Sequence, residues 1–309
     1  MNVEWYLKNN GVSGSDGSRD QDLMEPVTIE RATSIDFDRV YPLLLDFNNS
    51  RIAQDKWRQI FNTNWNSPEN YCGLLLLQGG RVEGYLGLLF SARMIKGRTE
   101  KFCNMTSWIV REGCRSQSLR LLFELLKLSD YTITNFTPSN NVTIILKKLG
   151  FMAIENNLRI LFPFPGEPLS DSRYHSTIDL EEMSQKLNPV DRTILFDHLR
   201  FNCHHVLIIG TNDYCYLVLK NTKYQQLQFA RVHYASHPDV LLKAIDLVRT
   251  RICRQLKVAA LIVDERHIGG ETIRYSRTCP VQYESYFKSK SLGKTDVDTL
   301  YSELILLHD

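Results

Sequence analysis

The sequence predicts an α/β protein with mixed α+β sheets, built from two units of similar design. Residues 102–151 read as strand, turn, helix, strand and helix, an order in which a helix connects two neighbouring parallel strands. A shorter version of this order recurs over residues 188–263. The chain has 309 residues, which is too long for one such unit and suits two. We therefore expect a tandem of two α/β domains.

Composition and charge exclude several classes of protein. Hydrophobic residues make up 43% of the chain and charged residues 23%, as in ordinary globular proteins. The net charge of +2 is too small to indicate a nucleic acid or an anionic membrane as partner. No apolar run approaches the ~20 residues that cross a bilayer. The seven cysteines form no CxxC pair and follow no signal peptide, which predicts reduced thiols in a soluble cytoplasmic protein. A homo-oligomer remains open.

The first part of the chain predicts a leader, one strand and two helices. Residues 1–25 contain a Gly/Ser/Asp tract that buries little apolar surface, so we expect a flexible leader. Val27–Ala32 alternates as a strand, and Ser34 caps a helix with an apolar stripe that reaches Phe47. A second helix is expected over residues 51–61.

The central strands follow as a hairpin and a third strand. Tyr71–Leu77 and Val82–Met94 form the hairpin, and Gly84 and Gly87 indicate a bulge or a close backbone approach. Phe102–Val110 is rich in aromatic and β-branched residues and suits a buried strand.

A helix from Ser116, a strand over residues 131–136 and a helix that ends at Gly150 complete the unit. Residues 151–154 and 158–161 are expected to finish its sheet. These elements place a helix N-terminus beside the carboxyl end of the Phe102 strand.

Two short segments here resemble motifs of the GNAT superfamily of acyl-CoA-dependent N-acyltransferases. Arg115-Ser116-Gln117-Ser118-Leu119-Arg120 stands where the family has an Arg/Gln-x-x-Gly-x-Gly/Ala turn for the pyrophosphate of coenzyme A. Leu146-Lys147-Lys148-Leu149-Gly150-Phe151 stands where it has Tyr-x-x-x-Gly-Phe. The resemblance covers roughly residues 27–163 in element order. Ser118 and Arg120 replace the small residues of the turn, and Leu146 replaces the tyrosine that often protonates the leaving thiolate.

The resemblance implies a coenzyme A site and an acceptor pocket. It implies acetyl-CoA or another acyl-CoA as co-substrate, with a backbone amide near Ile109, Val110 and Arg111 that stabilises the oxyanion. Its further contacts with the cofactor are Arg115, Gln117, Ser118, Leu119 and Arg120 in the turn, and Asn140 or Asn141 at the pantetheine arm. Trp57, Phe61 and Trp65 either contact the acceptor or pack against the sheet, and we favour packing.

The second half reads as a reduced copy of the first. Three prolines over residues 162–170 exclude a regular element, so we place a linker at residues 164–173 between domains of residues 26–163 and 174–309. Strands are expected over residues 206–209, 214–219, 227–234 and 258–263, with one helix over residues 238–256. No glycine turn follows the third of these strands. A last helix over residues 296–307 is expected to dock on a domain.

Candidate catalytic groups are few. The strand Phe102–Val110 has no carboxylate, which leaves Glu112 as a fallback base. The cluster Cys203-His204-His205 offers an imidazole, His204 foremost, which with His233 is expected to face the cleft between the domains and to accept a proton from an amine. A zinc site is disfavoured because neighbouring strand residues point to opposite faces, so we expect no metal.

We therefore expect an acyltransferase that moves an acyl group, preferably acetyl, from acyl-CoA to the amine of a small molecule or peptide. The alternative is a catalytically inactive GNAT-like module for binding or assembly, which the replaced glycines and tyrosine favour. A peptidyl-tRNA-dependent transferase would need a strongly basic channel, which the net charge of +2 does not offer.

Overall fold

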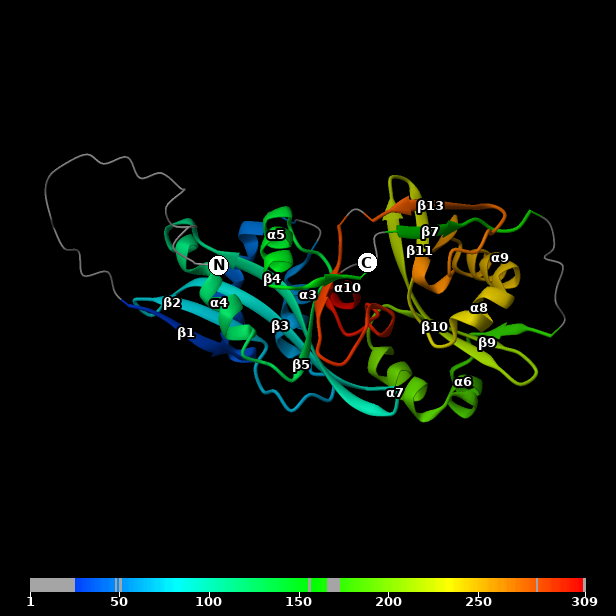
Figure 1. Ribbon diagram of the computed structural model, residues 1–309, viewed down its shortest axis with the longest axis horizontal. Helices are drawn as coiled ribbons and strands as arrows, with labels where there is room; N and C mark the ends of the chain where they lie inside the picture. The colour runs from blue at the N-terminus through cyan, green and yellow to red at the C-terminus, as the bar shows by residue number, and fades with distance from the viewer. Residues whose placement is uncertain are drawn as a thin grey trace, which may run out of the picture.

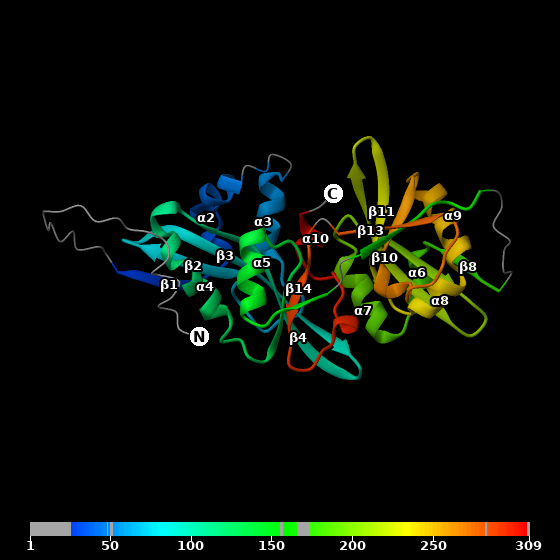
Figure 2. The same ribbon diagram turned by 45° about the horizontal axis from the view of Figure 1, so that its top comes forward.

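Two mixed sheets of seven strands each organise the chain (Figures 1 and 2). The computed structural model describes residues 26–47, 49, 52–154, 157–165, 173–281 and 283–307. The expected leader and most of the expected linker lie outside these residues. Among the residues described, no helix is long and apolar enough to cross a membrane.

The first sheet consists mainly of the elements expected from the first half. Its spatial order is β1 (Val27–Ala32), β2 (Gly73–Gln78), β3 (Arg81–Ile95), β4 (Arg98–Val110), β5 (Tyr131–Asn135), β14 (Tyr286–Lys288) and β6 (Met152–Ala153). Neighbouring strands are antiparallel except β4 and β5, which are parallel and joined through η3 (Glu112–Gln117) and α4 (Ser118–Leu125). The expected crossover is therefore confirmed.

Helices cover both faces of this sheet. Every residue of β2 from Gly73 to Leu77 is buried, because both faces of the strand are packed. Leu74 and Leu76 share a core with α4, whereas Leu75 and Leu77 share one with α2 (Phe37–Leu44) and α3 (Gln54–Asn62). The helix α5 (Asn140–Lys148) begins at Ser139, whose hydroxyl caps it, and Gly150 follows its end at φ 79°.

The second sheet repeats this plan. Its order is β8 (His175–Thr177), β9 (His204–Ile209), β10 (Tyr214–Tyr224), β11 (Leu227–Ala235), β12 (Ala260–Asp264), β7 (Asn157–Leu161) and β13 (Ser276–Pro280). Here β11 and β12 are the parallel pair. The single helix expected over residues 238–256 is two helices, α8 (Pro238–Lys243) and α9 (Ile245–Leu256), because the backbone leaves helical geometry at Ala244.

Each half gives one strand to the sheet of the other half. We expected residues 158–161 to complete the first sheet, and this is wrong: β7 pairs with β12 and β13. The corresponding place in the first sheet, between β5 and β6, is filled by β14 from near the end of the chain. A short strand with alternating apolar residues fits either sheet, so its sequence does not specify its partner. Figure 1 shows β7 in green with the yellow and orange strands, and Figure 2 shows β14 near β4.

A shared hydrophobic core joins the halves. The remaining short helices are η1 (Ser34–Asp36), η2 (Leu45–Phe47), α6 (Leu180–Lys186), α7 (Pro189–His198), η4 (Glu265–His267), η5 (Lys294–Asp296) and α10 (Glu303–Leu306). One core cluster includes Trp65 and Tyr85 of the first half with Leu195, Tyr216 and Ile305 of the second. The indole of Trp65 contacts the rings of His198, Phe201 and Tyr301. Because Trp65 and Phe61 are buried in this core, they pack as the sequence favours.

Candidate functional site

The strands β4 and β5 pair only briefly before a cavity separates them. Their parallel ladder covers Lys101–Asn104 against Tyr131–Thr134 and then stops. Just beyond it, β4 contains a bulge: Thr106 pairs with Gly87 and Ile109 with Tyr85, which leaves two residues opposite Leu86. A bulge bends its strand away from its neighbour. The expected irregularity near Gly87 is confirmed, although the extra residue lies on β4.

Ser107 lies in this bulge with a left-handed backbone. Its φ is 50°, a conformation that costs a residue with a Cβ about 1–2 kcal/mol. Such strain persists where surrounding structure imposes it, and it is frequent at functional sites. Ser107 and its neighbours Met105, Thr106 and Trp108 line the cavity.

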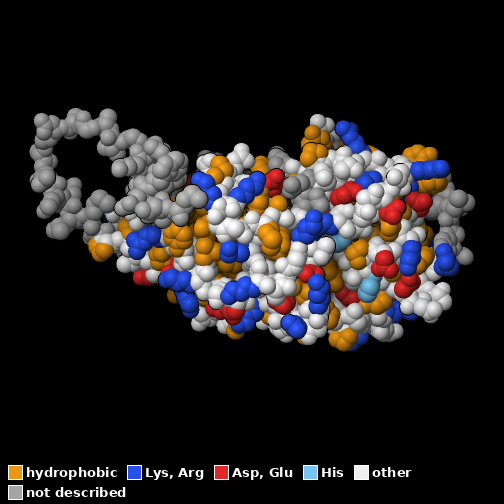
Figure 3. Space-filling model, viewed as in Figure 1, with side chains coloured by type: hydrophobic (Ala, Val, Ile, Leu, Met, Phe, Trp, Pro, Cys, Tyr) orange, Lys and Arg blue, Asp and Glu red, His pale blue; other side chains and the backbone are white. Residues whose placement is uncertain are grey.

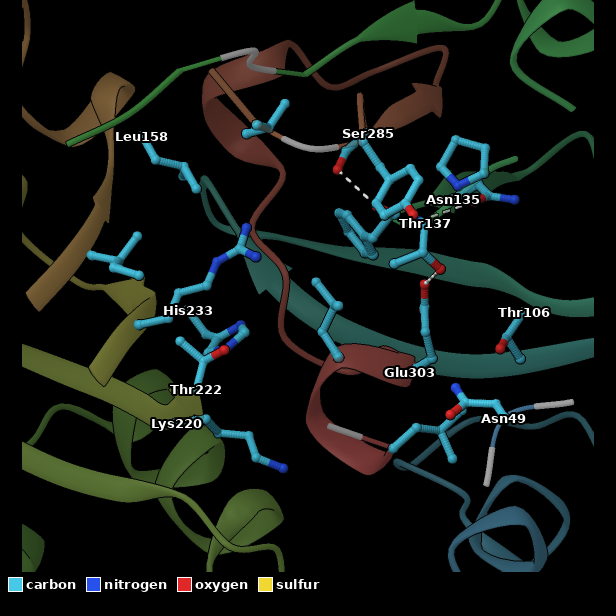
Figure 4. Close-up of a pocket in the computed structure, with 18 of the residues that line it drawn as sticks. Asn49, Thr106, Asn135, Thr137, Leu158, Lys220, Thr222, His233, Ser285 and Glu303 are labelled. Atoms are coloured by element: carbon cyan, nitrogen blue, oxygen red, sulfur yellow. Dashed lines mark hydrogen bonds between the residues drawn. The ribbon is translucent and has the colours of Figure 1, made fainter. Parts of the chain in front are cut away.

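The cavity has a volume of about 950 Å³ and lies between the two sheets. On the side of the first sheet it is lined by β4, by the segment that follows β5 and by Trp57 of α3. On the opposite side it is lined by β7, β10, β11, β12 and β13. The last helix, α10, contributes Glu303 and Leu304. Figure 4 shows Glu303 and Thr137 on one side and His233, Thr222 and Lys220 on the other.

Glu303 is a buried carboxylate held by two neutral donors. The residue as a whole is 2% exposed. Asn104 Nδ2 donates to its Oε2 at 2.5 Å, and Thr137 Oγ1 donates to its Oε1 at 2.9 Å. Thr134 Oγ1 in turn donates to Asn104 Oδ1 at 3.0 Å, which orients the amide. Burial raises the pKa of Glu303 above its ordinary 4.5, although the hydrogen bonds from these two side chains and from the backbone of Phe136 and Glu303 oppose the rise.

The opposite wall of the cavity is cationic. Lys220, Arg231, His233 and Arg277 line it. Lys220 Nζ donates to the carbonyl of Ile305 at 2.7 Å, and His233 Nδ1 lies 2.8 Å from Thr299 Oγ1. Within the described part of the chain, Arg231 makes no hydrogen bond and no ion pair. Burial lowers the pKa of Arg231. The negative charge of Asp264 opposes this shift, but Asp264 is already paired with Arg266.

The expected coenzyme A residues lie outside the lining of this cavity. On β4 the lining ends at Trp108, directly before Ile109, and after β5 it includes Ser139 and Val142 but neither Asn140 nor Asn141. The expected phosphate turn is the short helix η3 followed by the first turn of α4, and Arg115 and Arg120 are exposed there. Arg120 Nη1 donates to the carbonyl of Val27 at 2.9 Å. The turn directly follows the carboxyl end of β4 in sequence.

Two details bear on the roles expected along this segment. The amide of Arg111 already donates to the carbonyl of Glu83 at 2.8 Å, so it is not free to stabilise an oxyanion. A Cβ placed on Gly113 would meet no atom within 4 Å, so the turn is open rather than a close cradle. Val110, Gln117, Ser118, Leu119 and Asn141 keep their expected roles as predictions.

Of the three expected catalytic residues, only His233 lines the cavity. Glu112 is exposed on η3, and His204 lies half-buried on β9, outside the cavity lining. Its neighbour His205 is buried, with Nδ1 2.7 Å from the hydroxyl of Tyr216, and burial lowers its pKa to about 4. Among the residues that the structure describes, no group of three or more His, Cys, Asp or Glu could hold a metal ion.

Sequence reasoning missed Glu303 and Arg231, although both leave a signal. Glu303 lies three residues after Leu300 and four before Leu307, so it is on the apolar stripe of the last helix. Arg231 alternates with Phe229 and His233 on one face of β11. A charged residue on a face that is otherwise apolar, or shared with an imidazole, indicates a side chain that faces a cavity or a core.

The fold is similar to that of solved GCN5-related N-acetyltransferases. One from Anabaena variabilis matches with a TM-score of 0.53 at 10% identity, over 85% of this chain and 72% of that one. One from Kribbella flavida matches with a TM-score of 0.52 at 10% identity, over 87% and 72%. A protein from Pyrococcus horikoshii considered to be an acetyltransferase matches with a TM-score of 0.51 at 14% identity, over 93% and 96%.

These matches confirm the expected fold class, a tandem of GNAT-like folds, since they cover both halves of the chain. No family model and no curated protein matches the sequence.

Proposed function

We propose that the chain is an acyl-CoA-dependent N-acyltransferase, with acetyl-CoA as the first candidate donor. The observation that carries this proposal is the separation of β4 from β5 at the Ser107 bulge, with a cavity of about 950 Å³ behind it. A pantetheine arm can enter such an opening as an additional strand, because separated strands leave backbone groups without a ladder partner. The GNAT-like fold supports the same reading.

The chemistry is a direct transfer. The nitrogen of the acceptor amine attacks the thioester carbonyl, a C–N bond forms, the C–S bond breaks, and the amine loses a proton. We assign the stabilisation of the oxyanion to a backbone amide near Ile109 and Val110, as expected from the sequence. The cavity offers two acceptors for the proton, Glu303 and His233. Leu146 is fully buried and apolar, so the thiolate takes its proton from elsewhere.

We place the reaction in the cytoplasm. All seven cysteines are free thiols, as expected in a reducing compartment. Burial raises the pKa of Cys72 to about 12 and that of Cys253 to about 11, which keeps both thiols protonated and unreactive.

Calorimetric titration of the full chain with acetyl-CoA and with a longer acyl-CoA tests the proposal. We expect saturable binding, and we expect Arg115→Ala to weaken it about tenfold because a charged contact with phosphate is lost. The matched control is Arg254→Ala, which removes an exposed arginine of α9 in the other half and should leave the affinity unchanged.

Binding without acyl transfer is the second candidate, favoured by the apolar Leu146 in place of the tyrosine. Saturable acyl-CoA binding with no release of free thiol for any amine would support that inactive module. Absence of any heat with either acyl-CoA contradicts the proposed function.

A further inference from the structure

Glu303, which is buried, and Arg231, which is half-buried, lie on opposite walls of the cavity, and neither forms an ion pair within 4.0 Å with another described residue. The opposite charge that acts on Arg231 is that of Asp264, which is already paired with Arg266. The described side chains that donate hydrogen bonds to Glu303, those of Asn104 and Thr137, are both neutral. Arg231 makes no hydrogen bond and no ion pair with any residue that the structure describes. No ion pair within 4.0 Å joins Glu303 to a cation in this part of the chain.

Buried charges without counter-ions are costly, and natural proteins rarely keep them. A buried charge is normally paired, coordinates a metal or is neutralised by a shifted pKa. Elsewhere in this molecule the rule holds: Arg93 is buried and is paired with the partly buried Asp298, with Nη1 to Oδ1 at 2.8 Å. Glu303 and Arg231 differ from that pair because a cavity lies beside each of them. A ligand can therefore supply the counter-ions that the described residues do not provide.

The origins of the two groups place them at different walls. Glu303 comes from α10 and is held by β4 and the segment after β5, so it belongs to the wall of the first sheet. Arg231 comes from β11, next to His233 on the same strand face, so it belongs to the wall of the second sheet. Figure 4 shows Glu303 and His233 on opposite sides of the opening. Apolar residues such as Ile52, Phe229 and Leu307 line the space as well.

We propose that the acceptor is a zwitterionic amine: Glu303 receives its ammonium group at one wall, and Arg231 receives its carboxylate or phosphate at the other. This inference rests on the proposed function, since it names the substrate class of the same cavity. Transfer of the proton from the ammonium to Glu303 frees the nitrogen for attack on the thioester. Arg231 acts as a positioning residue that fixes the far end of the molecule, and its planar guanidinium suits a two-oxygen anion.

Matched amine pairs test the proposal with the full chain. One arm compares L-phenylalanine with phenethylamine and glycine with glycinamide, so that each pair differs in the carboxylate. The other arm compares phosphoethanolamine with ethanolamine. Each amine is titrated calorimetrically without acyl donor, and release of free thiol from acetyl-CoA is then measured to obtain kcat and KM.

We expect at least one anionic amine to bind about tenfold to a hundredfold more tightly than its neutral partner, as for a charged hydrogen bond in a buried site. The pair that shows this difference in affinity tells whether the site binds a carboxylate or a phosphate. Arg231→Gln should abolish this preference by raising KM for the anionic member only, and Arg231→Lys should restore part of it. Glu303→Gln should lower kcat for both members. Arg254→Gln on α9 is the control and should change neither.

Three results overturn the inference: equal affinity for the members of every pair, a preference that survives Arg231→Gln in a variant with a normal thermal transition, or no binding by any anionic amine. The failure of the proposed function is separate. If acetyl-CoA binds and anionic and neutral amines react equally well, the zwitterion inference is wrong but the proposed function holds. If the anionic amines bind more tightly than their neutral partners but no acyl-CoA binds, the charged site is supported and the proposed acyltransferase function is wrong.

Discussion

Glu303 shows how a single buried residue links packing to chemistry. It is 2% exposed, and both of its oxygens accept hydrogen bonds from residues of the first sheet. Those donors favour the ionised form, whereas burial disfavours it, and burial dominates, so the pKa is raised. A carboxyl group with a raised pKa beside a cavity is a frequent feature of catalytic sites. Its role can therefore be tested through pH as well as through turnover.

The raised pKa of Glu303 predicts a pH-dependent cost in stability. Above its ordinary pKa of 4.5, the unfolded chain releases a proton that the folded chain retains, so the free energy of unfolding falls as pH rises through the folded pKa. Glu303→Gln removes this loss of stability at high pH, because glutamine does not ionise. We therefore expect the stability of the variant relative to the natural chain to be higher at about pH 8 than at about pH 4.

Urea unfolding at both pH values measures that difference. Glu181→Gln, which alters an exposed carboxylate of α6, is the control. An equal stability difference for Glu303→Gln at the two pH values would contradict the raised pKa.

At the scale of elements, the hairpin of β2 and β3 depends on one aromatic ring lying over two glycines. Gly73 pairs with Gly87, and the ring of Tyr85 covers both of them. The ring is fully buried, and its hydroxyl donates to the carbonyl of Cys72 at 3.0 Å. Gly87 pairs on its other side with Thr106, at the start of the bulge that opens the cavity. These glycines therefore permit the packing that holds the bulge in place.

Substitution of Gly73 tests this packing. A Cβ at Gly73 would lie 2.4 Å from Cε2 of Tyr85 and 2.8 Å from the carbonyl oxygen of Leu86. Because both neighbours are fixed in the core, we expect Gly73→Ala to lower the free energy of unfolding by about 1–3 kcal/mol. Gly113→Ala, at an exposed site with open space, should change it by less than about 0.5 kcal/mol. If urea unfolding gave the same change in the free energy of unfolding for Gly73→Ala and Gly113→Ala, the packing of the Tyr85 ring would not depend on glycine at position 73.

At the scale of the whole molecule, the reciprocal exchange of β7 and β14 makes the halves interdependent. Each strand fills a place inside the other half's sheet, with partners on both sides. The shared core around Trp65 and Tyr301 adds apolar contact between the halves. On the face in Figure 3, basic and acidic side chains are interspersed. The cationic wall of the cavity is thus a local feature, made where the two sheets face each other.

The exchange predicts that the two halves unfold together. Phe287 of β14 is 1% exposed and packs with Phe102 and Phe136 of the first half. Phe287→Ala should lower the free energy of unfolding by about 3–5 kcal/mol, since it leaves a cavity in the core. Amide hydrogen exchange should accelerate in α9 of the second half as well as in α4 of the first, because both belong to one cooperative unit.

Phe196→Ala is the matched control, because Phe196 is 58% exposed on α7 and should contribute little. Faster exchange in α4 alone, with α9 unchanged after Phe287→Ala, would show that the halves are independent units.

The sequence alone determined the order of elements from Val27 to Gly150, the parallel crossover after the Phe102 strand and the repetition of this plan in the second half. Those features depend on local periodicity, caps and turn residues, which short segments encode. The sequence also named His233 as a candidate, and this residue lines the cavity, while its role as a base stays a prediction.

Only the tertiary structure decided which sheet β7 and β14 join and which charges face the cavity. A strand with alternating apolar residues can pair with the edge of either sheet, so its partner depends on which sheet edge is free in the folded structure. Glu303 meets Asn104 across 199 positions of sequence. No local pattern specifies contacts over such a separation, because they form only when the core brings distant elements together.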